Sequence, residues 1–209
     1  MKAIIFGSPG SGKGTQAVIL SEYLKLKKIS LGDILREEVK KESDLGKEVK
    51  SFVEKGILVS DELVSRVIEE NIKIDNFLLD GYPRNLKQAQ HLEKTLEKND
   101  KKLDFLIYLD IDEKAVEDRL SQRRVCKLCG ANFHLENMPS KEEGVCDICD
   151  GELIQRKDDT PEVIKKRWEI FSNESKSILE FYTGKLKIIK VNANEDKDSI
   201  FSDIKEQLQ

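Results

Sequence analysis

The chain has 209 residues, of which 36 are Lys or Arg and 40 are Asp or Glu, so its formal net charge is −4. This balance argues against a sequence-independent nucleic-acid binder, which needs a basic excess to displace counterions from phosphates. With 38% apolar and 36% charged residues, the composition excludes a chain that is disordered throughout, a lone coiled coil and a mini-protein. The length suits one α/β domain with insertions, or two small domains.

Short apolar or β-branched runs alternate along the chain with longer segments of helical period, which is typical of a parallel sheet covered by helices. Five strands are predicted, at residues 3–6, 28–31, 77–80, 105–109 and 187–191. Amphipathic helices are predicted at residues 15–26, 31–41, 61–71, 86–97, 113–122 and 161–182. Thr160 and Pro161 favour the start of the last helix, because Thr can cap free amides and Pro is tolerated in the first turn.

No stretch approaches the roughly 20 apolar residues that a membrane-spanning helix needs, so no membrane partner is expected. The N-terminal run reaches Gly7 before a signal-peptide core could form, and we therefore expect an intracellular, cytoplasmic protein. The segment from about residue 125 to 155 breaks the helical pattern and contains all four cysteines. It is interpreted as a small inserted domain.

A glycine-rich segment directly follows the first predicted strand and precedes a predicted helix. It reads Gly7-Ser8-Pro9-Gly10-Ser11-Gly12-Lys13-Gly14-Thr15. Glycines let backbone amides face a phosphate, the helix N-terminus adds a positive dipole, and Lys13 supplies a point charge. The usual phosphate-loop pattern has Ser or Thr directly after the Lys, whereas here Gly14 intervenes before Thr15. The alternative is a ligand-free turn, but the strand and helix context favours a site for nucleotide phosphates.

Arginine is scarce, with 8 residues against 28 Lys, so its positions are informative. A planar guanidinium binds phosphate oxygens in a bidentate manner that Lys cannot reproduce. Several arginines are therefore expected to face phosphate, whereas Arg66 and Arg124 are expected to pair with surface carboxylates. Arg119 and Arg123 are four residues apart at the end of a predicted helix and are expected to share one face.

Asp80 ends an apolar strand, at the edge where open α/β sheets bind ligands. It could hold Mg²⁺ directly or through water, or merely begin a turn. The two histidines, His91 and His134, have no evident partners in the sequence and are interpreted as surface or loop residues. Trp168 is interpreted as a packing residue.

The glycine-rich segment, together with Leu79-Asp80-Gly81-Tyr82-Pro83-Arg84, resembles the adenylate kinase family of nucleoside monophosphate kinases. The resemblance continues in order through Gly32-Asp33-Ile34-Leu35-Arg36, Gly56-Ile57-Leu58-Val59, Arg119, Arg123-Arg124, Arg156-Lys157-Asp158-Asp159 and Arg167. It implies an α/β fold of the P-loop NTPase type, with a doubly wound five-stranded parallel sheet and helices on both faces. It also implies a core of residues 1–29, 60–121 and 160–209, a nucleoside-monophosphate-binding insertion at 30–59, and a lid at 122–159.

The resemblance further implies the reaction ATP + AMP ⇌ 2 ADP with Mg²⁺, carried out by a monomer. The implied ATP-binding residues are Gly10, Ser11, Gly12, Lys13, Gly14, Thr15, Arg119, Arg123, Asn132, Phe133 and Glu195. The implied AMP-binding residues are Leu31, Arg36, Ile57, Leu58, Val59, Gly81, Tyr82, Pro83, Arg84, Gln88, Arg156 and Arg167. The implied catalytic residues are Lys13, Arg84, Arg123, Arg156 and Arg167.

Two departures from the family pattern concern the nucleotide bases. Leu31 stands where many members carry a small hydroxyl residue near the AMP base, so the preferred acceptor base is less firmly implied than the reaction. Ala193 replaces the more usual Gly in a loop that resembles the one over the ATP adenine. This second departure weakens the implied backbone contact at Glu195.

The cysteines occur as two C-x2-C pairs, Cys126 with Cys129 and Cys146 with Cys149. The spacing between the pairs falls in the range that is typical of structural zinc sites. Four thiolates would form a closed tetrahedral site with no position for a catalytic water. Disulfides are the alternative, and a reducing compartment disfavours them.

Two other functions remain open at this point. Leu31 motivates a kinase for UMP, CMP or GMP, although by family resemblance the pyrimidine kinases have short lids. A zinc-ribbon binding protein with a regulatory phosphate loop is the alternative from another class. Its natural target would be nucleic acid, which the acidic balance disfavours.

Overall fold

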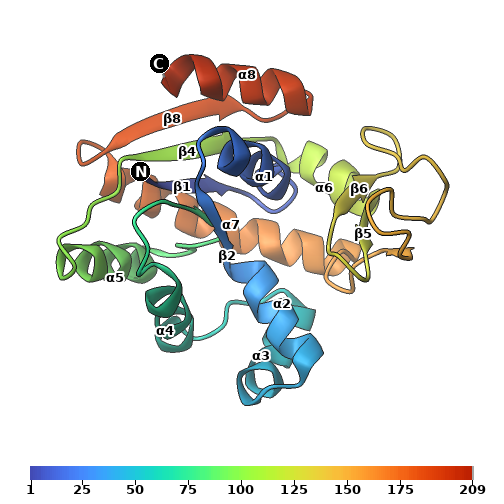
Figure 1. Cartoon of the computed structure of the whole chain (residues 1–209), viewed down its shortest axis with the longest axis horizontal. Helices are drawn as coiled ribbons and strands as arrows, with labels where there is room; N and C mark the ends of the chain where they lie inside the picture. The colour runs from blue at the N-terminus through green and yellow to red at the C-terminus, as the bar shows by residue number, and fades with distance from the viewer. Residues whose placement is uncertain (209) are drawn as a thin grey trace.

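The computed structural model describes residues 1–208, which form a five-stranded parallel sheet with helices on both faces (Figure 1). The strands are arranged in the order β2-β3-β1-β4-β8. Their bounds are Lys2–Gly7 (β1), Lys27–Ser30 (β2), Phe77–Asp80 (β3), Phe105–Asp110 (β4) and Lys187–Asn192 (β8). All four strand pairings are parallel. The expected five-stranded α/β fold is therefore confirmed.

The helices cover the two faces of the sheet because both faces of β1 are apolar. Ile4 and Phe6 belong to one buried cluster, and Ala3 and Ile5 belong to the other. Successive strand residues face opposite sides, so both sides need a cover of helices. The helices are α1 (Lys13–Tyr23), α2 (Leu31–Lys41), α3 (Asp44–Lys55), α4 (Asp61–Asn71), α5 (Leu86–Glu97), α6 (Glu113–Ser121), α7 (Pro161–Tyr182) and α8 (Lys197–Leu208).

The sequence prediction omitted α3 and α8, although both carry apolar residues at helical spacing. Ile200 and Ile204 of α8 are buried against the sheet. The expected strand at 28–31 ends at Ser30 instead, because the Ser30 side chain accepts from the Asp33 amide and caps α2. The expected start of α7 is confirmed, with Thr160 as the N-cap residue and Pro161 in the first turn, but the Thr160 side chain makes no capping hydrogen bond within residues 1–208.

A second, smaller sheet lies in the segment that was interpreted as an insertion. Its strands are β5 (Arg123–Cys126), β6 (Asn132–His134) and β7 (Leu153–Ile154), and they pair antiparallel in the order β6-β5-β7. Figure 1 shows this sheet at one end of the molecule, while α2 and α3 lie together on another side. Lys157 Nζ lies 3.1 Å from Glu54 Oε1, so the two segments contact each other. No helix within residues 1–208 has the length and apolar character needed to cross a membrane.

Replacement of Gly46 by Ala is expected to destabilise the packing of α2 against α3. A Cβ at this position would lie 2.0 Å from the carbonyl oxygen of Glu38, which belongs to the backbone and cannot rotate away. The two helices must then separate, at a cost of about 1–3 kcal/mol. Urea unfolding of G46A and of the exposed control Lys50→Ala measures the effect. Because Ala favours helix over Gly, equal or greater stability of G46A would contradict the tight packing.

Candidate active site

One cleft of about 520 Å³ lies along the carboxyl ends of the parallel strands. Its walls include the glycine-rich loop after β1, the segment after β3, the start of α2 and the small sheet. Asp80 is at the end of β3, and it is 8% exposed. This is the edge at which parallel α/β sheets bind ligands.

The glycine-rich loop turns from β1 into α1 through left-handed backbone positions. Gly10 has φ 78° and Gly12 has φ 86°, conformations that other residues rarely adopt. Lys13 Nζ folds back over this loop and donates to the carbonyl oxygen of Ser8 at 2.6 Å. The pKa of Lys13 is lowered to about 7, mainly by burial; Asp80 opposes this shift, and the nearby cations Arg84, Arg167 and Arg123 add to it. The ammonium group therefore lacks a full counter-charge.

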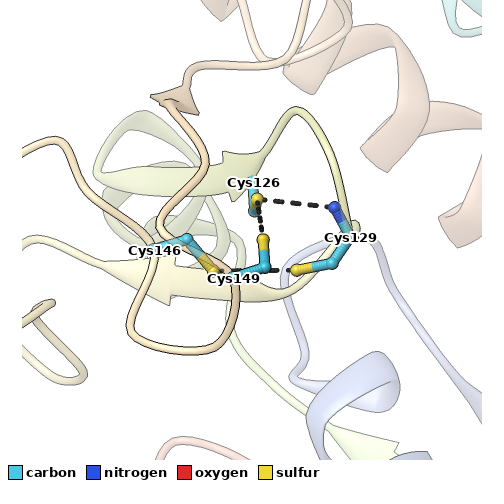
Figure 2. Close-up of side chains that lie close together, drawn as sticks. All are labelled: Cys126, Cys129, Cys146 and Cys149. Atoms are coloured by element: carbon cyan, nitrogen blue, oxygen red, sulfur yellow. Dashed lines mark hydrogen bonds between the residues drawn. The ribbon is translucent and has the colours of Figure 1, made fainter.

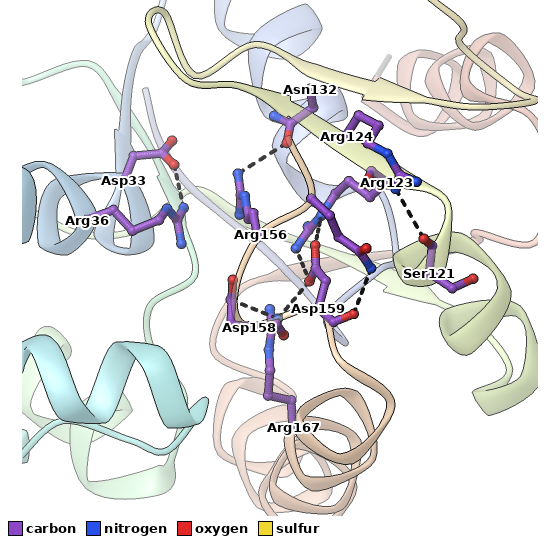
Figure 3. Close-up of polar contacts among 11 residues, drawn as sticks. Asp33, Arg36, Ser121, Arg123, Arg124, Asn132, Arg156, Asp158, Asp159 and Arg167 are labelled. Atoms are coloured by element: carbon purple, nitrogen blue, oxygen red, sulfur yellow. Dashed lines mark hydrogen bonds and ion pairs between the residues drawn. The ribbon is translucent and has the colours of Figure 1, made fainter. Parts of the chain in front are cut away.

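Arginines from different parts of the chain meet beside this loop (Figure 3). Arg123 donates to both carboxylate oxygens of Asp159 at 2.8 and 2.6 Å, and Arg167 lies 3.0 Å from Asp158 and 3.4 Å from Asp159. Arg156 donates to Asn132 Oδ1 at 3.2 Å. Two carboxylates thus hold arginines in place without neutralising the whole group.

Desolvation and like charge lower the pKa values of these arginines. Burial, and then Arg36 and Arg123, lower the pKa of Arg156 to about 9. Enclosure by the cleft walls, and then Arg167 and Arg36, lower the pKa of Arg84 as well. Cations that repel one another in a partly enclosed cleft favour a polyanion, because a polyphosphate would supply the missing negative charge.

Most of the residues implied as nucleotide contacts line the cleft. They are Gly10, Gly12, Lys13, Gly14, Thr15, Arg36, Leu58, Gly81, Tyr82, Pro83, Arg84, Arg119, Arg123, Asn132, Phe133, Arg156, Arg167 and Glu195. Asp80, the candidate Mg²⁺ residue, also lines the cleft. The remaining ones, Ser11, Leu31, Ile57, Val59 and Gln88, are not among its lining residues. Leu31 and Gln88 are each 1% exposed. Gln88 is held by the Arg84 amide at 2.8 Å and by Asp61 Oδ1 at 2.9 Å.

The expectation that Arg119 and Arg123 share a helix face is wrong, because α6 ends at Ser121 and Arg123 belongs to β5. Arg119 instead donates to three backbone carbonyls, those of Ala193, Asn194 and Glu195, at 2.6–3.1 Å. Arg124 donates to the carbonyls of Ser121 and Arg123 rather than to a carboxylate. Arg66 is exposed and has no ion pair within residues 1–208.

Sequence reasoning named no role for several groups of the site. Asp158 and Asp159 anchor the arginines, and the signal for them was a pair of acids directly after Arg156 and before α7. Asp33, in the first turn of α2, forms an ion pair with Arg36 at a distance of 2.5 Å. His91 has a partner after all, since its Nε2 lies 2.7 Å from Glu69. His134 lines the cleft, and its Nδ1 accepts from the amides of Glu136 and Asn137.

The four cysteines converge at one end of the small sheet (Figure 2). Their sulfur atoms all lie within 4.8 Å of one another, with 3.4 Å between Cys126 and Cys149 and 3.6 Å between Cys129 and Cys146. These are the separations expected of sulfurs around a tetrahedral zinc ion, in which each Zn–S bond is about 2.3 Å. None of the cysteines forms a disulfide. The donor set and its geometry therefore fit a structural metal.

Replacement of Lys13 by Met is expected to raise the unfolding temperature of the ligand-free protein. The Lys13 pKa is about 7 in the folded protein and near 10.5 in the unfolded chain, so the penalty of burying the charge is complete below pH 7. The penalty decreases as pH rises from 7 towards 10.5, because there the unfolded chain binds more protons. Thermal scans should show a gain of a few degrees at pH 6.5 and a smaller gain at pH 9.5. A gain independent of pH, or an equal gain in the exposed control Lys50→Met, would contradict this assignment.

Comparisons with known proteins agree with the geometry of the cleft. The family model described as "Adenylate kinase" matches residues 5–187. A protein named "Adenylate kinase" from Caldanaerobacter subterraneus subsp. tengcongensis is 40% identical, over 100% of this chain and 96% of its own length. A protein of the same name from Caldicellulosiruptor bescii is 42% identical, over 94% of this chain and 93% of its own length. Another from Clostridium tetani is 38% identical, over 98% of this chain and 96% of its own length. With a matching family model and relatives of this identity over its full length, the chain belongs to the adenylate kinase family.

Proposed function

We propose that the protein transfers the γ-phosphoryl group of Mg-ATP reversibly to AMP and so forms two ADP. The observation that carries this proposal is the convergence of Lys13 and several arginines on one cleft at the carboxyl edge of the sheet. Phosphoryl transfer needs positioning and charge neutralisation rather than covalent catalysis. Family membership supports the same reaction and does not favour a regulatory binding module.

The donor nucleotide is assigned to the side of the cleft that contains the phosphate loop. Residues 10–15 would surround its phosphates, with Lys13 following the transferred group. Arg119 and Arg123 would hold ATP from the stem of the lid, and the backbone near Asn132, Phe133 and Glu195 would lie close to its base or ribose. Asp80 would hold Mg²⁺, directly or through water, and the ion supplies charge neutralisation when it is bound.

AMP is assigned to the side of the cleft near α2 and the segment after β3. Its phosphate and the group in transfer would be bound by four arginines that line the cleft. Arg36 and Arg84 come from the AMP side, whereas Arg156 comes from the proposed lid and Arg167 from α7. Leu31, residues 57–59, residues 81–84 and Gln88 would surround the base. Leu31 and Gln88 are 1% exposed, so base contact at these two positions requires the cleft to rearrange.

Residues 30–59 and 122–159 are proposed to act as the monophosphate-binding insertion and the lid, joined to a core of residues 1–29, 60–121 and 160–209. Both insertions contribute cations to the cleft, Arg36 from one and Arg123 and Arg156 from the other. Their approach would exclude water and so protect the γ-phosphate from hydrolysis. We also propose that the protein acts as a cytoplasmic monomer on ATP, AMP and ADP, without a nucleic-acid partner. A thiol-rich metal site suits a reducing compartment.

Purified protein with Mg-ATP and AMP is expected to form ADP, and Arg84→Ala is expected to lower kcat by about 10²–10³-fold. Arg84 faces the cleft, and within residues 1–208 its side chain binds only the Gly81 carbonyl, at 2.8 Å, so its guanidinium is available to phosphate. ATP affinity, measured by titration calorimetry, should be little changed. The exposed Arg66→Ala is the matched control.

Parallel reactions with GMP, UMP and CMP as acceptor test the assignment of AMP. Faster transfer to one of these would replace AMP by that nucleotide in the proposal. Undiminished turnover of R84A would refute the role given to Arg84. Absence of transfer to any acceptor would refute the proposed reaction.

Zinc is proposed as the metal held by Cys126, Cys129, Cys146 and Cys149, where it would stabilise the lid. Removal with a strong chelator is expected to lower the unfolding temperature, because the lid has few buried apolar residues of its own. Elemental analysis should find about one zinc ion per chain. Cys146→Ser is expected to melt lower and to be insensitive to chelator. Wild-type melting that chelator leaves unchanged, together with a metal-free protein, would refute the site.

A further inference from the structure

Gln16 presents a buried hydrogen-bond acceptor at the cleft. It lies in α1, three residues after Lys13, lines the cleft and is 1% exposed. Its Nε2 donates to the carbonyl oxygen of Lys197 at 2.7 Å. Because a carbonyl can only accept, this bond requires the amide nitrogen to face Lys197 and directs Oε1 elsewhere. Oε1 is buried and has no hydrogen-bond partner within residues 1–208.

A buried acceptor without a partner is costly, so its retention beside a cleft points to a ligand that donates to it. The amide cannot rotate to offer its nitrogen instead. Rotation would break the bond to Lys197 and place Oε1 against the Lys197 carbonyl, two acceptors facing each other. Gln16 therefore holds an acceptor of fixed orientation in the wall of the cleft, and a ligand reaches it only when the cleft rearranges, as at Leu31 and Gln88.

The loop that binds Gln16 is the one assigned to the donor base. Asn194, Glu195, Asp196 and Lys197 all line the cleft. Arg119 holds this loop by donating to the carbonyls of Ala193, Asn194 and Glu195. With its phosphates at the loop before α1, the donor would extend its base towards residues 194–197. Gln16 connects the phosphate side and the base side of this site, since it lies in α1 and binds Lys197.

We propose that Gln16 Oε1 accepts a hydrogen bond from the exocyclic 6-amino group of the donor purine and thereby selects ATP over GTP. This inference rests on the proposed function, because it takes the cleft to hold a donor nucleotide. A 6-keto purine places an acceptor oxygen where ATP places a donor. GTP would thus leave Gln16 Oε1 unpaired and opposed to a second acceptor.

The test compares kcat/KM for ATP and GTP as donors with AMP as the constant acceptor. Gln16→Met removes the acceptor and should lower the ATP-to-GTP ratio by about tenfold. Gln16→Lys keeps a donor for the Lys197 carbonyl and places only donors at the base, so it should lower activity with ATP and raise activity with GTP. General destabilisation of the fold would instead lower activity with both donors.

Asp112→Ala is the matched control for loosening of the loop. Asp112 is exposed, lies outside the cleft lining, and accepts from Asn194 Nδ2 at 3.2 Å. Its removal should change kcat/KM for ATP and GTP by the same factor. A wild-type ratio in Q16M, or the same shift of ratio in Q16M and D112A, would overturn the role of Gln16.

The wild-type protein provides a second test that does not depend on the folding of a variant. A purine ribonucleoside triphosphate without the 6-amino group should show about tenfold lower kcat/KM than ATP. Equal kcat/KM for the two donors would overturn the proposal. ADP formation from ATP and AMP by the wild type is measured first, so failure of the proposed function is distinguished from failure of the Gln16 assignment.

Discussion

The mutual repulsion of cations at the carboxyl edge of the sheet is the constraint on which the rest of the site depends. Lys13, Arg84, Arg156 and Arg167 are partly desolvated, and each lies near other positive groups that lower its pKa. Bringing them together costs free energy in the ligand-free protein. The fold meets this cost with packing elsewhere, above all in the two apolar clusters on either side of the sheet.

Asp158 and Asp159 limit the repulsion without removing it. Asp159 has a fully buried side chain and binds both Arg123 and Arg167, so these cations are held at defined positions. Within residues 1–208, Arg84 has no such carboxylate partner, and Lys13 binds only a backbone carbonyl. Carboxylates therefore fix the arginines where β5 and α7 meet, and the site keeps unneutralised charge where a phosphoryl group would pass. Electrostatic preorganisation of this kind costs no rearrangement at the moment of transfer.

The parallel sheet and the phosphate loop could be predicted because both depend on local patterns. The strand at 77–80 and the loop of residues 7–15 are each a single continuous segment of the sequence. The strand follows from its burial, and the loop follows from the conformations of its glycines. The partners of the arginines could not be predicted in this way. The binding of Arg119 to residues 193–195 and of Arg123 to Asp159 joins segments far apart in the chain, and only the topology of the sheet brings them together. Helical spacing alone placed Arg119 and Arg123 together, and the end of α6 at Ser121 separates them.

The segment proposed as the lid, residues 122–159, carries cations of the cleft but has little core to stabilise it. Its own buried cluster consists of Cys126, Phe133 and Cys146, with a few half-buried neighbours. So small a core cannot by itself offset the entropy of ordering the segment. Cys126 and Cys146 belong to this cluster and also to the proposed metal site, so packing and coordination would stabilise the same turns. Arg123 and Arg156 thus extend into the cleft from a segment that has little apolar core of its own.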